Sequence, residues 1–159
     1  MRMWSSAIII GSIAAFALAA AAGCGEGSAK IPVERKTCRA ADGVEIVYSV
    51  AGTGEPALVF IHGGLANRGF WDGQLQAFGG RHRTIAIDLP GHGESGSDRT
   101  KWGLPEFAAD VKAVIKAEGA RKFIIFGNSL GGPVAIEAAL LLPGRVLGVV
   151  GVDTFQIID

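Results

Sequence analysis

The chain has 159 residues, enough for a single domain with a sizeable core. Lys and Arg together number 15, as do Asp and Glu, so the formal net charge is zero. Because no basic stripe accompanies this balance, we expect no nucleic-acid partner.

The first 23 residues have the pattern of an export signal. Arg2 gives a positive start, residues 4–22 form an uncharged apolar run, and small residues follow. Residues 21–24 read Ala-Ala-Gly-Cys, which resembles the lipobox of bacterial lipoproteins. The resemblance implies cleavage before Cys24, a lipid on that cysteine, and a place at the cell membrane or outer surface.

Two other interpretations of this leader stay open. An ordinary signal peptide would give a secreted protein, and an uncleaved anchor would need a run that is barely long enough to span a bilayer. Residues 24–36 are predicted to be a tether, and residues 37–159 the folded domain. Cys38 is then an unpaired structural thiol, or the partner of an unlipidated Cys24 in a disulfide.

Strand and helix patterns alternate along the folded part. Strands are predicted at residues 37–41, 44–51, 57–61, 84–87, 123–126 and 146–152. Helices are predicted at residues 70–78 and 104–117 and from the Gly-rich turn to residue 142. This order predicts an α/β fold, a mostly parallel sheet with helices on both faces. If the 159 residues were a complete protein, we expect that the last strand, 146–152, would be an uncovered apolar edge.

Ser129 lies where a predicted strand turns sharply into a helix. Residues 127–131 read Gly-x-Ser-x-Gly directly after the apolar run 123–126. Glycine at 127 and 131 lets the strand and the helix approach closely. The serine stands at a helix N-terminus, whose free N–H groups favour negative charge. The pattern is that of a nucleophile elbow, with a capping serine in a plain turn as the alternative.

Three motifs follow three predicted strands in order. They are residues 62–64 (His-Gly-Gly), residues 88–95 (Asp-Leu-Pro-Gly-His-Gly-Glu-Ser) and residues 127–132 (Gly-Asn-Ser-Leu-Gly-Gly). Open α/β sheets build their sites at such strand ends. With these motifs, residues 37–159 resemble the N-terminal portion of the α/β-hydrolase fold superfamily.

The resemblance implies a serine hydrolase of esterase type without a cofactor. Its small-molecule substrate would be a carboxylic ester or a related carbonyl compound, which forms an acyl-enzyme on Ser129. The elbow is also similar to those of carbon–carbon bond hydrolases. Serine rather than aspartate argues against the dehalogenase and epoxide-hydrolase branches, whose nucleophile is a carboxylate.

The resemblance also implies an oxyanion hole and a loop-shaping histidine. The oxyanion donors would be the backbone N–H groups of Leu130 and Gly64, with Leu65 as the alternative to Gly64. Glycine suits position 64, because a side chain there would crowd the substrate carbonyl. His62 is expected to shape this loop rather than to catalyse.

The base of the expected triad is missing after Ser129. In this superfamily the order is Ser, then Asp or Glu, then His. All histidines, namely His62, His82 and His92, precede the serine. The carboxylates after it are Glu137, Asp153 and Asp159. Asp153 is the candidate acid, since some relatives place theirs after the corresponding strand.

We therefore expect the chain to be a truncated hydrolase that is inactive by itself. The alternative is a non-catalytic, lipid-anchored binding protein on a partial hydrolase fold.

Two further patterns are interpreted as structural. Residues 91–96 match Gly-x-Gly-x-x-Gly, but no helix is predicted to open on them, so we expect no nucleotide. His62, Asp88 and His92 lack the spacing of a metal site, so we expect no metal.

Overall fold

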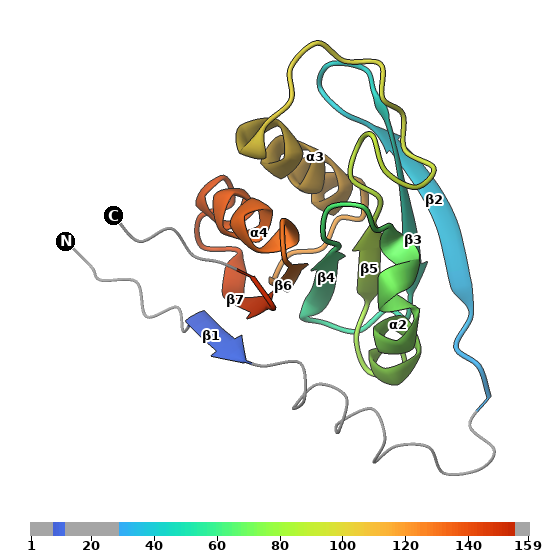
Figure 1. Ribbon diagram of the computed structural model, residues 1–159. Helices are drawn as coiled ribbons and strands as arrows, with labels where there is room; N and C mark the ends of the chain where they lie inside the picture. The colour runs from blue at the N-terminus through green and yellow to red at the C-terminus, as the bar shows by residue number, and fades with distance from the viewer. Residues whose placement is uncertain (1–7, 12–28, 155–159) are drawn as a thin grey trace.

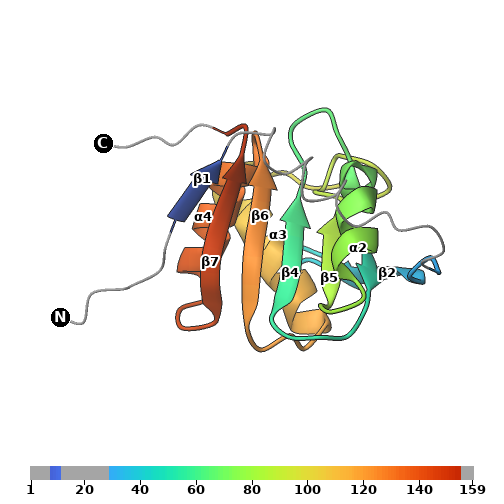
Figure 2. The same cartoon turned by 90° about the horizontal axis from the view of Figure 1, so that it is seen from below.

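A mixed sheet of seven strands forms the centre of the computed structural model, which describes residues 8–11 and 29–154 (Figure 1). The strands are β1 (Ile8–Gly11), β2 (Val33–Arg39), β3 (Glu45–Ala51), β4 (Ala57–Ile61), β5 (Thr84–Ile87), β6 (Phe123–Asn128) and β7 (Val146–Val152). Their order across the sheet is β1-β7-β6-β4-β5-β3-β2. The pairs from β1 to β5 are parallel, whereas β3 is antiparallel to both β5 and β2. Figure 2 shows the arrows of β7, β6, β4 and β5 pointing the same way.

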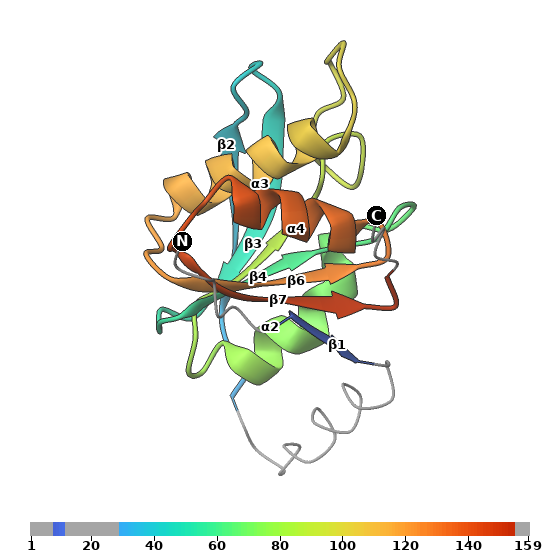
Figure 3. The same ribbon diagram turned by 90° about the vertical axis from the view of Figure 1, so that its left-hand side faces the viewer.

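Helices cover both faces of this sheet. α3 (Leu104–Ala117) and α4 (Gly131–Leu140) lie on one face, and η1 (Arg68–Trp71) and α2 (Asp72–Phe78) lie on the other (Figure 3). The predicted α/β fold with a mostly parallel sheet is confirmed. No helix in residues 29–154 is long and apolar enough to cross a bilayer.

The side chains of the central strand β4 pack into the apolar layers on both faces of the sheet. Every residue of β4 is buried, as expected for a strand covered on both faces. Val59 and Ile61 join the layer beneath α3 and α4, whereas Phe60 joins the layer beneath η1 and α2. The Phe60 ring lies 4.9 Å from that of Phe126 and 5.1 Å from that of Trp71, centroid to centroid. These contacts fix η1 against the ends of β4 and β6.

Four predicted elements have the observed boundaries, and others differ at their ends. β4, β5, α3 and β7 match the predicted ranges. β2 begins at Val33, inside the segment expected to be a tether, because an exposed edge strand with charged residues gives little apolar signal. The predicted helix 70–78 consists of η1 and α2, since the Asn67 side chain accepts the Gly69 N–H and starts the turn earlier. α4 ends at Leu140, before residue 142.

The predicted uncovered edge at β7 is wrong. Ile8–Gly11, which belongs to the predicted leader, pairs in parallel with Val149, Val150, Gly151 and Val152. The apolar run of β7 predicts a strand, but its side chains do not determine which segment pairs with its backbone.

Cys38 is a free, partly buried thiol in β2. Burial, together with the charges of Asp110 and Glu118, raises the pKa of Cys38 to about 11. The thiol is therefore protonated at neutral pH and a poor nucleophile, which favours the structural interpretation. Cys24 lies outside the described residues.

The turn from β6 into α4 leaves no room for a Cβ atom at two glycines. A Cβ on Gly127 would lie 2.1 Å from the Gly131 carbonyl oxygen, and one on Gly131 would lie 2.4 Å from the Ile61 carbonyl oxygen. Both obstacles are backbone atoms, which cannot move aside as a flexible side chain can. The steric role predicted for these glycines is confirmed.

Gly131→Ala is expected to lower the free energy of unfolding by about 3 kcal/mol, because the added Cβ must displace the end of β4. Gly73→Ala is the matched control, since a Cβ there meets nothing within 4 Å. This control should raise stability by about 0.5–1 kcal/mol, the ordinary preference of a helix for alanine. Urea unfolding followed by circular dichroism measures both, and a Gly131→Ala protein as stable as the wild type would contradict the steric argument.

Candidate active site

Ser129 lies at the carboxyl edge of the sheet, directly after β6. Its φ of 47° is in the left-handed region, which residues other than glycine rarely adopt. Its N–H donates to the Val152 carbonyl at the end of β7, 3.1 Å away. Strain of this kind persists only where the surroundings hold it, and it is common at functional sites.

The loop after β4 lies against this turn. A Cβ on Gly63 would lie 2.8 Å from Asn128 Oδ1 and 3.1 Å from Ser129 Cβ, and one on Gly64 would lie 3.9 Å from Leu130 Cδ2. Gly64 and Leu130, the predicted oxyanion donors, are thus on adjoining loops. Among contacts with other protein atoms, a side chain would clash at Gly63 and would fit at Gly64.

Leu65, the alternative donor, has a φ of 62° and a fully exposed side chain. Like Ser129, it is a non-glycine residue held in the left-handed region just beyond a strand. The two strained residues therefore lie in the connections that follow the neighbouring strands β4 and β6.

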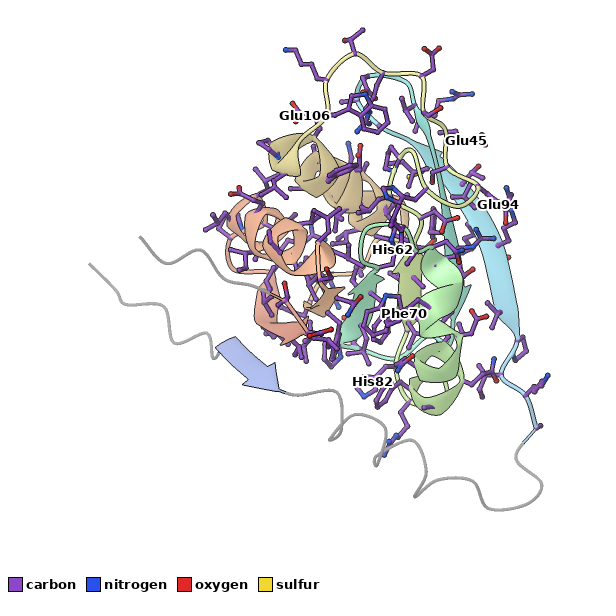
Figure 4. All side chains as sticks on the ribbon, viewed as in Figure 1. Glu45, His62, Phe70, His82, Glu94 and Glu106 are labelled. Carbon is purple, nitrogen blue, oxygen red and sulfur yellow. The ribbon has the colours of Figure 1, made fainter. Side chains whose placement is uncertain are left out.

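His62, labelled in Figure 4, directly follows β4, and its ring joins two loops. The Leu89 N–H donates to Nε2 at 3.1 Å, so Nδ1 carries the proton and donates to the Gly63 carbonyl at 2.7 Å. The side chain is fully buried, and burial is the main reason why the pKa of His62 is lowered. The neutral ring shapes the loop as expected and has no free nitrogen to act as a base.

The other two histidines also bond away from the serine. His82 Nδ1 lies 3.0 Å from the Pro56 carbonyl oxygen, just before β4, and His92 Nδ1 lies 3.3 Å from that of Pro90. Among residues 29–154, no imidazole hydrogen bonds with the Ser129 hydroxyl.

Asp153 follows β7 at the same edge of the sheet. It is exposed and has a φ of 46°. Val152 is paired with Asn128, so Asp153 and Ser129 are the first residues beyond two neighbouring strands. The structure places the candidate acid beside the elbow without a hydrogen bond between the two side chains in the described residues.

Sequence reasoning missed two residues that hold the elbow. Thr154 Oγ1 donates to the Ser129 carbonyl at 2.6 Å, and Asn128 Nδ2 donates to the Val152 carbonyl at 3.0 Å. The sequence indicates a role for them only through their positions, Asn128 at the end of one predicted parallel strand and Thr154 beyond the end of another. Their partners lie more than 20 residues away, which no local pattern indicates.

A third missed residue, Arg68, ties the loop after β4 to the loop after β5. Buried Asp88 accepts the Arg68 N–H at 2.6 Å, the Glu94 N–H at 2.9 Å and the Arg68 guanidinium. The guanidinium also pairs with the Glu94 carboxylate, which lowers the pKa of Glu94, with Arg35 adding to the effect. The motif at residues 88–95 thus acts as a brace for the loop beside Ser129.

No group of three or more His, Cys, Asp or Glu side chains in residues 29–154 is arranged to hold a metal ion. No helix opens on residues 91–96, because α3 begins at Leu104. A cavity of about 460 Å³ beside Val33 and Arg83 and another of about 500 Å³ beside Asp42 and Arg99 have no elbow residue in their walls.

His62 is expected to make stability depend on pH below about 6.5. Its pKa is lower in the folded chain than the ordinary 6.5, so between the two values the unfolded chain binds more protons. This contribution is complete above pH 6.5 and decreases as pH falls. The urea concentration at the unfolding midpoint should therefore decrease when the pH is lowered from 7.5 to 5. The decrease should be smaller in His62→Gln. Thr53→Val, at an exposed loop position, is the control and should keep the wild-type decrease; an unchanged decrease in His62→Gln would contradict the assignment.

Comparisons with known proteins agree with this architecture. Residues 56–159 match the alpha/beta hydrolase fold family. A serine hydrolase-like protein from Danio rerio is 36% identical over 104 residues, which are 64% of this chain and 32% of that protein. Epoxide hydrolase B from Mycobacterium tuberculosis (strain ATCC 25618 / H37Rv) is 35% identical over 101 residues, 62% of this chain and 28% of that enzyme. The crystal structure of esterase RhEst1 from Rhodococcus sp. ECU1013 aligns with a TM-score of 0.68 and 34% identity over 79% of this chain and 47% of the esterase.

The aligned part is the smaller part of each relative. The chain spans 38% of one curated relative and 27% to 32% of others. The family match nevertheless covers most of this chain, including all three strand-end motifs. The chain therefore belongs to the alpha/beta hydrolase fold family.

Proposed function

We propose that this chain is the nucleophile-bearing part of a serine hydrolase that acts on a carboxylic ester or a related carbonyl substrate. The observation that carries the proposal is the strained turn at Ser129, with the loop of Gly63 and Gly64 against it. A serine on such a turn presents its hydroxyl at the top of the sheet.

In the proposed reaction, Ser129 Oγ attacks the carbonyl carbon and gives its proton to a base. The negative charge that develops on the carbonyl oxygen is stabilised by the N–H groups of Leu130 and Gly64. Loss of one such donor costs about 3–4 kcal/mol in related chemistry. The alcohol leaves with the proton, and water then hydrolyses the acyl-enzyme.

The base in this proposal is a histidine that the 159 residues do not contain. The hydrogen bonds of the three described rings are made with backbone groups, and the family order puts the histidine after the nucleophile and the acid. Asp153 is the candidate acid. We therefore expect no turnover from the 159-residue chain alone.

The relatives' names support hydrolysis but differ in substrate. One similar protein is named an esterase and another an epoxide hydrolase. Serine at position 129 favours acyl transfer over the carboxylate chemistry of epoxide opening. Carbon–carbon bond hydrolysis, which uses a similar elbow, is the second reaction class within the proposal.

The first experiment is to sequence the gene beyond codon 159 and to express the protein with whatever sequence follows. If the frame continues, the longer protein should hydrolyse a p-nitrophenyl ester, and Ser129→Ala should lower kcat by at least about 10³-fold. Ser97→Ala, in an exposed loop, is the control. Turnover that survives Ser129→Ala would contradict the nucleophile assignment. If the 159-residue chain alone shows turnover that is lost in Ser129→Ala, the proposal that the base lies outside these residues is wrong.

A non-catalytic binding protein is the second candidate function. The observation that favours it is that all three histidine rings make hydrogen bonds with backbone groups rather than with Ser129. A stop codon directly after codon 159, together with no turnover, would support this alternative over the hydrolase.

We also propose that the protein is exported and held at the membrane by a lipid on Cys24. The pattern of residues 1–24 supports this, with the residues up to β2 as a tether. Cleavage before Cys24 would remove β1 together with the leader. The edge of β7 would then be free to pair with another strand.

Cys24→Ser should abolish lipid attachment in a bacterial host. The wild type is expected in the membrane fraction and to incorporate radiolabelled palmitate, and Cys24→Ser to do neither. Cys38→Ser removes the other thiol and should behave as the wild type. Palmitate on the Cys24→Ser protein, or a wild type without palmitate, would contradict the anchor.

A further inference from the structure

The carbonyl of Ser129 is held from two sides. Thr154 Oγ1 donates to this oxygen at 2.6 Å, and the Gly132 N–H donates to it at 3.0 Å. The first bond comes from beyond β7 and the second from the first turn of α4. The carbonyl therefore joins two elements that are adjacent only in the folded chain.

This carbonyl belongs to the same peptide group as the Leu130 N–H. A trans peptide is planar, and its C=O and N–H point in opposite directions. A bond that fixes the direction of the Ser129 C=O therefore also fixes the direction of the Leu130 N–H. That N–H is one of the two oxyanion donors in the proposed function.

Two glycines make the space that Thr154 occupies. A Cβ on Gly132 would lie 2.0 Å from Thr154 Oγ1, and one on Gly151 would lie 2.6 Å from Thr154 Cγ2. The turn between β6 and α4 requires Gly127 and Gly131, but Gly132 has no such role there. Its missing side chain leaves room for Thr154. Asp153, with its φ of 46°, changes the direction of the chain after β7, and the next residue, Thr154, contacts the Ser129 carbonyl.

We infer that Thr154 is a positioning residue that directs the Leu130 N–H toward the oxyanion. The inference rests on the proposed function for its catalytic meaning, but the hydrogen bond itself can be tested separately. The end of β7 is also held by Ser129 N–H and Asn128 Nδ2, both of which donate to Val152. Loss of the Thr154 hydroxyl should therefore loosen one peptide group rather than detach the strand.

Two substitutions separate the hydroxyl from the packing. Thr154→Val keeps the shape and loses the donor, whereas Thr154→Ser keeps the donor and loses a methyl group. Thr53→Val, at an exposed loop position, is the matched control. If the hydroxyl positions the peptide, only Thr154→Val is impaired. If packing matters instead, Thr154→Ser is the impaired variant.

The first readout is amide hydrogen exchange of Gly132 in the 159-residue chain, measured by NMR. The Gly132 N–H shares its acceptor with Thr154, so its exchange should be about tenfold faster in Thr154→Val. Thr154→Ser and Thr53→Val should stay within about twofold of the wild type. Unchanged exchange in Thr154→Val, or equal acceleration in Thr154→Ser, would overturn the inference.

The second readout is ester hydrolysis by the longer protein, if it shows turnover that depends on Ser129. Because an oxyanion donor acts mainly in the transition state, Thr154→Val should lower kcat about tenfold with KM within about twofold, and Thr154→Ser should restore kcat. Faster Gly132 exchange with an unchanged kcat would overturn the catalytic part. If no turnover depends on Ser129, the proposed function fails, and the exchange result alone decides whether Thr154 holds the turn.

Discussion

The close approach of three backbone segments at the carboxyl edge is the constraint on which the site depends. α4 starts against the ends of β6 and β4, with no side chain between them at Gly127 and Gly131. This contact lets a serine occupy the turn with its N–H bonded to β7. A Cβ at either glycine would push the helix away and relax the strained φ of Ser129. The geometry of the site thus follows from the absence of two side chains.

Strain is concentrated at the same edge. The three non-glycine residues with positive φ in the described chain are Leu65, Ser129 and Asp153, and each lies beyond the end of a parallel strand. Hydrogen bonds from distant segments compensate for this strain. The buried ring of His62 and the carboxylate of Asp88 fix the loops after β4 and β5. In the proposed function, loops held by these hydrogen bonds would keep the backbone donors in position, which is the condition under which such donors stabilise an oxyanion well.

Sequence patterns were reliable where one local property determined the outcome. β4 and β5 are short apolar runs because these parallel strands are buried on both faces, and α3 shows the apolar spacing of a helix packed on one side. The predicted start of the charged edge strand β2, residue 37, lies after its observed start at Val33. The partner of β7 was missed, because strand pairing uses backbone groups that every residue carries.

The sequence by itself determined the strand, the sharp turn and the serine at its apex, since glycine spacing and an apolar run are local properties. It also determined that no histidine follows Ser129. Only the tertiary structure decided that His62 bridges two loops, that Arg68 braces Asp88 and that Thr154 holds the Ser129 carbonyl. These contacts join residues 20 or more positions apart in the chain. They form only when parallel strands bring their carboxyl ends to one edge, and no pattern within a short stretch of sequence carries that information.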